Sequence, residues 1–122
     1  MGQKILMIDD RNENLISLEV LLDDGERELF QALSGNEGLK ILMKEPVDVV
    51  ILDVNMPGMS GYETAELMRL NPKTQTIPII FVTADDDDKK QSFEGEALAG
   101  VDYVHKPVDA GKLIETIQRL TA

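Results

Sequence analysis

Short apolar runs recur along this chain, and each is followed by a segment with the periodicity of a helix. The runs lie at about residues 4–8, 28–33, 48–52, 78–82 and 101–104. The helical segments lie at about residues 13–24, 36–44, 61–70, 87–99 and 109–121. Alternation of strands and helices predicts one parallel sheet, and nearly continuous apolar runs are typical of strands that helices cover on both faces. We therefore expect an α/β fold with parallel strands.

Composition narrows the class of protein. The 122 residues suffice for a single domain, which we place at residues 1–122, and 43% of them are hydrophobic. The apolar runs are too short to cross a membrane, and the first residues lead directly into a strand without room for a signal peptide. A net charge of −11 disfavours direct binding to nucleic acid. The absence of cysteine excludes disulfides and thiol chemistry, and it fits a cytoplasmic location.

Reactive polar side chains stand where several of the apolar runs end. Asp9 and Asp10 follow the first run, Asp53 the third and Thr83 the fourth, and Lys106 comes shortly after the fifth. The carboxyl ends of parallel strands gather at one edge of a sheet, where ligands bind. Carboxylates, a hydroxyl and an ammonium would share a small pocket there. That set suits a divalent cation and a phosphoryl group, with one carboxylate as the nucleophile.

Each of these carboxylates also has an ordinary structural explanation. Asp9 and Asp10 can bind Mg²⁺, which needs only one or two carboxylates beside waters and phosphate, or they can cap the helix that follows. Asp53 can attack phosphorus and form an acyl phosphate, or it can serve as a turn residue before Pro57. Asn55 can offer its backbone carbonyl to the metal.

The other candidate residues also have both a functional and a structural explanation. Thr83 can donate to a phosphoryl oxygen or simply end a strand. Lys106 can pair with phosphate or lie on the surface before a turn, and a cis bond to Pro107 is one way of placing it. Tyr103 can be a half-buried ring on an edge strand, or it can swing between inward and outward positions. His105 is the only histidine, and we expect it at the rim of the pocket.

Local signals mark where helices begin. Ser60 and Glu63 have the spacing of a capping box at the third helix. The acidic run at residues 85–88 would stabilise the N-terminus of the helix at 87–99, whereas Gly95 in its interior weakens that helix. The helix at 87–99 is either a frayed surface helix or an element whose stability is low because it must shift.

Four motifs together resemble the receiver domain of two-component response regulators. They are Ile8-Asp9-Asp10, Leu52-Asp53-Val54-Asn55-Met56-Pro57-Gly58-Met59-Ser60-Gly61, Val82-Thr83-Ala84 and Tyr103-Val104-His105-Lys106-Pro107. The resemblance covers essentially the whole chain and implies a doubly wound, flavodoxin-like sheet of order 2-1-3-4-5 with five helices on its two faces. The segment from Asp9 to Leu15 is most similar to receivers attached to sensor kinases or multidomain regulators.

The resemblance also implies a function. Asp53 would accept a phosphoryl group from a phosphohistidine on a histidine kinase or a histidine phosphotransfer domain. Asp9, Asp10, Asp53 and the carbonyl of Asn55 would hold Mg²⁺. Such a domain is a phosphoacceptor rather than an enzyme, with only self-catalysed transfer and slow autodephosphorylation.

Other residues would use the phosphoryl group to signal. Lys106 would pair with it and Thr83 would hydrogen-bond it. Thr83 and Tyr103 would move together and remodel the face made by the fourth helix, the fifth strand and the fifth helix. That face can bind an output domain or a second copy of the chain.

Two other functions fit parts of the pattern. Phosphatases that form an aspartyl phosphate on small substrates commonly place a second aspartate two residues after the nucleophile. Here that residue is Asn55, so a general acid is missing. A flavin-binding protein of similar fold is disfavoured because Asp9 and Asp10 would repel the flavin phosphate at the first strand–helix loop.

Overall fold

The computed structural model describes residues 2–84 and 100–122. Its strands are β1 (Lys4–Ile8), β2 (Glu28–Ala32), β3 (Val49–Asp53), β4 (Ile79–Thr83) and β5 (Val101–His105). The described residues contain four helices, α1 (Asn12–Leu22), α2 (Gly35–Lys44), α3 (Gly61–Leu70) and α5 (Ala110–Thr121). These elements closely follow the ranges expected from the sequence. The expected fourth helix at 87–99 and the acidic run at 85–88 lie outside the described residues.

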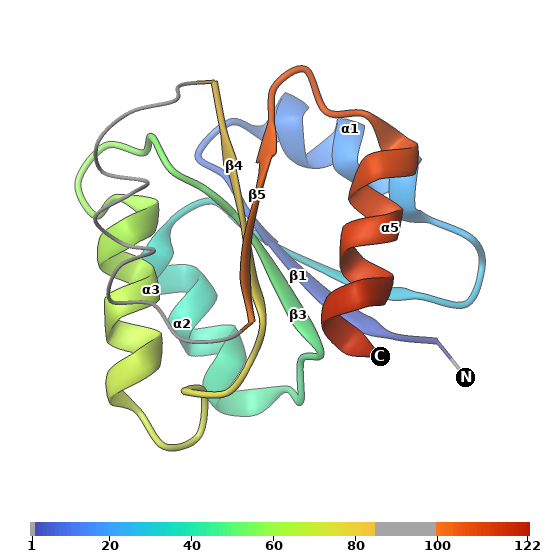
Figure 1. Ribbon diagram of the computed structural model, residues 1–122. Coiled ribbons are helices and arrows are strands. Elements are labelled where there is room, and N and C mark those ends of the chain that lie inside the picture. The colour runs from blue at the N-terminus through green and yellow to red at the C-terminus, as the bar shows by residue number, and fades with distance from the viewer. Residues whose placement is uncertain (1, 85–99) are drawn as a thin grey trace.

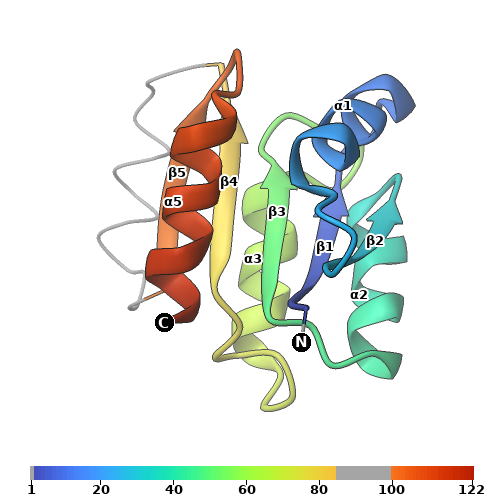
Figure 2. The same cartoon turned by 90° about the vertical axis from the view of Figure 1, so that its right-hand side faces the viewer.

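The strands form one parallel sheet in the order β2-β1-β3-β4-β5, which confirms the predicted topology. Helices α1 and α5 cover one face of the sheet, and α2 and α3 cover the other (Figures 1 and 2). The register places Ile8 opposite Leu52, Asp53 opposite Val82, and Thr83 opposite His105. The residues that follow β1, β3, β4 and β5 therefore meet at one edge. Among the described helices, none is long and apolar enough to span a bilayer.

Alternation along the buried strands divides the core into two layers. Ile51 packs with α1 and α5 in an aliphatic layer, whereas Val50 and Leu52 point to the side of α2 and α3. The second layer also contains the buried rings of Phe81, Tyr62 and Tyr103. Both faces of the central strands are thus covered, which explains why their sequences are apolar at nearly every position.

The start of α3 confirms the capping box expected at Ser60. The Ser60 hydroxyl accepts from the backbone N–H of Glu63 at 3.2 Å, and the Glu63 carboxylate accepts from the backbone N–H of Ser60 at 3.0 Å. Two of the backbone donors that a helix leaves unpaired are satisfied in this way. The cap sets the point at which the chain turns back from the end of β3 into α3.

Candidate functional site

Three carboxylates meet at the carboxyl edge of the sheet. Asp9 and Asp10 follow β1, Asp53 ends the neighbouring β3, and one carboxylate oxygen from each lies within 4.8 Å of the others. The side chains of Asp9 and Asp53 are buried, with 3% and 4% of their surface exposed. Asp10 is more accessible to solvent. The sequence had placed all three at one edge, and the structure brings them together.

Lys106 reaches this cluster from the end of β5. Its ammonium donates a hydrogen bond to Oδ1 of Asp53 at 3.1 Å, which also makes an ion pair. The backbone N–H of Lys106 donates to the carbonyl of Thr83 at 2.9 Å, so the loop after β5 stays beside the end of β4. The peptide bond between Lys106 and Pro107 is cis. Among the residues that the structure describes, the pocket therefore sets the ammonium of Lys106 beside three carboxyl groups.

The electrostatics of the pocket raise the pKa of Asp53 above its usual value. Burial is the largest cause, because it penalises the charged carboxylate, and the charge of Asp9 adds to it, with a smaller contribution from Asp10. Lys106 opposes these effects through its hydrogen bond and its charge. A divalent cation among the three carboxylates would oppose them further.

Asp9 is held in place by two donors from the start of α1. Its Oδ1 accepts from the backbone N–H of Arg11 at 2.9 Å, and its Oδ2 accepts from the side-chain amide of Asn14 at 3.1 Å. No role was predicted for Asn14 from the sequence. The position of Asn14 in the sequence does indicate this contact. A polar residue in the first turn of a helix lies beside the end of the strand that leads into that helix.

Gly61 allows α3 to press against the backbone of Asp53. A Cβ atom at Gly61 would lie 2.3 Å from the carbonyl oxygen of Asp53 and 2.9 Å from the Cα of Val54. The backbone N–H of Gly61 also donates to the carbonyl of Val54 at 2.9 Å. This close approach is a second feature that sequence reasoning missed.

The two expected switch residues are both buried. Thr83 ends β4 with 2% of its surface exposed, and Tyr103 in β5 is 6% exposed. Tyr103 therefore lies inward and is more buried than the half-buried ring considered from the sequence. Asn55 is exposed in the loop after β3. Its role as a carbonyl ligand remains a prediction, as do the roles of Thr83 and Tyr103.

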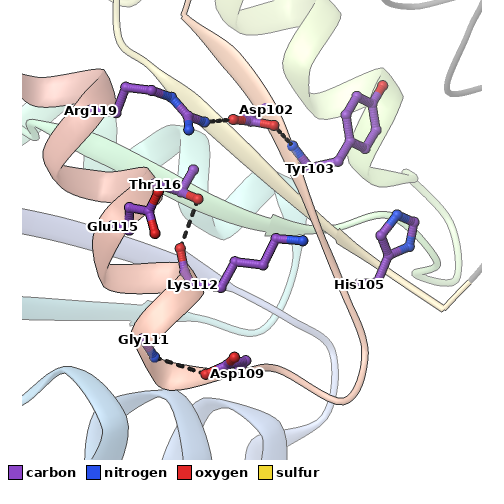
Figure 3. A pocket seen from close by; sticks show the side chains of 9 residues that line it. All are labelled: Asp102, Tyr103, His105, Asp109, Gly111, Lys112, Glu115, Thr116 and Arg119. Carbon is purple, nitrogen blue, oxygen red and sulfur yellow. Dashed lines mark hydrogen bonds and ion pairs between the residues drawn. The ribbon is translucent and has the colours of Figure 1, made fainter.

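The described part of the chain has hollows beside the site and on the neighbouring surface of β5 and α5. A cleft of about 230 Å³ opens between α1 and residues 106–108, and its wall includes Asp9, Lys106 and the apolar side chains of Leu18 and Val108. A wider surface pocket of about 680 Å³ lies over β5 and α5 (Figure 3).

The wider pocket has a mixed charge. An ion pair joins Arg119 of α5 to Asp102 of β5, and Asp102 also accepts from the backbone N–H of Tyr103 at 2.7 Å. Lys112 and His105 contribute to the same lining (Figure 3). His105 thus lines this wider pocket, and the acidic cluster found among the described residues consists of Asp9, Asp10 and Asp53.

Comparison with known proteins assigns the family. The family model of the response regulator receiver domain matches residues 5–118. The chain belongs to this family. Receiver domains work in two-component signalling with histidine kinases as partners.

Relatives support the same assignment for this receiver domain. Protein PilH of Pseudomonas aeruginosa is 30% identical over 119 residues, which cover 98% of this chain and 98% of PilH. The structure of the chemotaxis protein CheY4 of Vibrio cholerae matches with a TM-score of 0.88 and 31% identity, over 98% of this chain and 99% of that one.

A more distant structure shares only the fold. It is the receiver domain of a sensor histidine kinase of Pseudomonas aeruginosa, with a TM-score of 0.87, 22% identity and coverage of 99% of this chain and 98% of that one. That domain was solved with a magnesium ion coordinated in its active-site cleft. Several other curated relatives are longer proteins, and this chain spans between 19% and 48% of their length.

Proposed function

We propose that this receiver domain is a phosphorylation-activated switch whose phosphoacceptor is Asp53. The donor is a phosphohistidine on a partner histidine kinase or histidine phosphotransfer domain. One observation carries the proposal: the ammonium of Lys106 lies 3.1 Å from Asp53 Oδ1, inside a cluster of three carboxylates. A buried nucleophilic carboxylate with a cation beside it is suited to attack phosphorus.

The transfer exchanges one bond for another. A carboxylate oxygen of Asp53 forms a bond to phosphorus as the bond between phosphorus and the histidine nitrogen breaks, and the nitrogen leaves with that electron pair. Such reactions depend mainly on alignment and on stabilising charge on the phosphoryl oxygens. Lys106 supplies positive charge at that position, and Thr83 donates its hydroxyl to a phosphoryl oxygen.

The carboxylates fit a magnesium site. Mg²⁺ prefers oxygen ligands and retains several waters, so Asp9, Asp10 and Asp53 with the carbonyl of Asn55 form a sufficient set. Asp9 supports this assignment because Arg11 and Asn14 already orient both of its oxygens. When bound, the ion would supply positive charge that keeps Asp53 ionised and stabilises the phosphoryl oxygens.

The partner approaches across the cleft between α1 and residues 106–108. Its wall joins the apolar side chains of Leu18, Pro107 and Val108 to Asp9 and Lys106 of the site. A donor that covers these apolar groups would exclude water as it brings its phosphohistidine to Asp53.

The signal leaves through a second surface, which includes β5 and α5. Thr83 and Tyr103 respond to the phosphoryl group and remodel the face to which β5 and α5 contribute, with the expected fourth helix as its third part. The pocket over β5 and α5 lies on this face, which is where we place an output domain or a second copy of the chain (Figure 3).

We also propose that the whole chain acts as a single domain. Residues 1–122 act as one receiver domain that accepts and loses a phosphoryl group, and they do not turn over a separate small substrate. The net charge of −11 favours protein partners over direct contact with nucleic acid.

Intact mass after incubation with acetyl phosphate and Mg²⁺ tests this function. The parent should gain one phosphoryl group, and Asp53→Asn should gain none. Asp23→Asn, which changes an exposed aspartate after α1, is the matched control and should label like the parent. Undiminished labelling of Asp53→Asn would place the nucleophile elsewhere, and sustained turnover of phosphate esters would favour a phosphatase.

A further inference from the structure

Three aromatic rings form a continuous row on the face of the sheet that α2 and α3 cover. The ring of Tyr62 lies 4.9 Å from that of Phe81, centroid to centroid, with an angle of 49° between the planes. The ring of Phe81 lies 5.2 Å from that of Tyr103, at 31°. All three are buried, with 9%, 0% and 6% of their surface exposed. Tilted rings at such distances attract one another beyond the effect of burial alone.

One end of this aromatic row lies beside the backbone of Asp53, the proposed phosphoacceptor. At one end, Tyr62 follows Gly61, whose backbone is pressed against the carbonyl of Asp53 and donates to that of Val54. In the middle, Phe81 lies opposite Leu52 of β3 and opposite Tyr103 of β5. The row therefore runs from the backbone beside Asp53 to the residue proposed to report its phosphorylation.

We propose that Tyr62 is a positioning residue of the switch. Its ring supports Phe81 from the side of α3, and Phe81 in turn packs on Tyr103 only while Tyr103 is buried. Tyr62 thereby sets the equilibrium between the buried and exposed positions of Tyr103 before any phosphoryl group arrives. This inference rests on the proposed role of Tyr103 as a switch residue.

The two positions of Tyr103 differ in their contact with Phe81. An interaction shifts an equilibrium only by the amount by which it favours one state over the other. The contact between Phe81 and Tyr103 is made in the buried state and is lost when Tyr103 turns outward. Without the ring of Tyr62, Phe81 can tilt away and the buried state loses part of that contact. The ratio of exposed to buried Tyr103 should then rise about two- to tenfold, the range expected for one aromatic pair.

The composition of the chain makes a direct test possible. It contains two tyrosines, Tyr62 and Tyr103, and no tryptophan. Replacement of Tyr62 therefore leaves Tyr103 as the sole tyrosine, which can be observed by fluorine NMR after labelling with 3-fluorotyrosine. Acrylamide quenching of its fluorescence measures the exposure of the same ring.

Tyr62→Phe and Tyr62→Leu form the matched pair. Both lack the hydroxyl of Tyr62 and both leave one tyrosine, so they differ only in the ring at residue 62. We expect Tyr62→Phe to keep the resonance of buried Tyr103, and Tyr62→Leu to raise the exposed population and the quenching. Equal exposed populations in the two variants would overturn the proposal.

A second comparison separates positioning from general loosening of the core. Met68 is fully buried in the same helix, so Met68→Ala in the Tyr62→Phe background leaves a cavity and lowers stability. It should leave Tyr103 buried. If it exposes Tyr103 as much as Tyr62→Leu does, the aromatic row has no specific role and the proposal fails.

The spectra are recorded without a phosphodonor, so their result is independent of phosphoryl transfer. The parent is incubated separately with acetyl phosphate. Absence of uptake at Asp53 would contradict the proposed function, whereas the two variants at residue 62 would still decide whether Tyr62 holds Tyr103 inward.

Discussion

The apolar core and the acidic pocket are consecutive parts of the same strands, yet burial has opposite effects in them. Ile51 and Leu52 of β3 are exposed by 1% and 0%, and their burial stabilises the fold because it removes apolar surface from water. Asp53, the next residue, is 4% exposed beside two like charges. Burial of that carboxylate opposes folding, as the raised pKa of Asp53 indicates.

This difference explains how the domain holds a reactive group. A stable core allows the pocket to keep charges that disfavour one another, and a divalent cation among them would offset that repulsion. Perturbed pKa values are often found at functional sites for this reason. Changes in the core should therefore lower stability, whereas removal of the charge of Asp53 should alter the chemistry of the pocket and increase stability.

The largest loss of stability is expected in the core. Ile51→Ala removes most of a buried side chain between the sheet and helices α1 and α5, and should lower the free energy of unfolding by about 2–5 kcal/mol. Urea denaturation followed by circular dichroism measures the change. Ile16→Ala, at a side chain that is 51% exposed, is the control and should have little effect. Equal losses in both variants would contradict the described core.

A smaller loss is expected where the core meets the pocket. Gly61→Ala places a methyl group 2.3 Å from the carbonyl oxygen of Asp53, so the start of α3 must shift. We expect a loss of about 1–3 kcal/mol and slower uptake of phosphate from acetyl phosphate. Gly111→Ala is the control, because its Cβ would make only an ordinary contact of 3.6 Å with Asp109. Normal stability and labelling in Gly61→Ala would show that the close approach has no consequence.

In the pocket itself, loss of the charge should increase stability. Asp53→Asn in EDTA at neutral pH should be more stable than the parent by about 0.5–2 kcal/mol, as stabilising substitutions commonly are. The pKa of Asp53 is raised in the folded state, so the folded parent binds the proton more tightly than the unfolded chain does. The stability of the parent therefore falls as pH rises from the unfolded pKa to the folded pKa.

It follows that the advantage of Asp53→Asn is largest above the folded pKa and disappears as pH falls below the unfolded value. Thermal unfolding of both proteins across this acidic range measures the difference. An advantage that grows toward low pH would contradict the raised pKa of Asp53.

The smallest change in stability is expected at Asn14, whose side chain holds Asp9 of the pocket in place. Asn14→Ala removes one hydrogen bond to Asp9 and should cost about 0.5–1.5 kcal/mol. Mg²⁺ binding should weaken about tenfold, because an oriented ligand loses its second donor. Titration calorimetry measures the affinity, and Asn12→Ala, at an exposed residue of the same helix, should bind Mg²⁺ like the parent. Unchanged affinity in Asn14→Ala would remove Asn14 from the site.

Much of the fold could be predicted because its signals are local. The run from Val49 to Leu52 marks a buried strand by composition alone, and Ser60 and Glu63 mark the start of α3 by their spacing. Asn14 and Gly61 were missed because their importance depends on what lies opposite them. Asn14 matters through Asp9, and Gly61 matters through a carbonyl that the turn after β3 brings close.

The amino-acid sequence alone determined the α/β class, the strands and the edge at which Asp9, Asp10 and Asp53 gather, since periodicity and strand ends act over short stretches of chain. Only the tertiary structure decided that Lys106 donates to Asp53 across 53 residues of sequence. It also decided that Tyr103 lies inward on Phe81. Such contacts depend on strand register, loop geometry and side-chain rotamers together, and no local pattern encodes that combination.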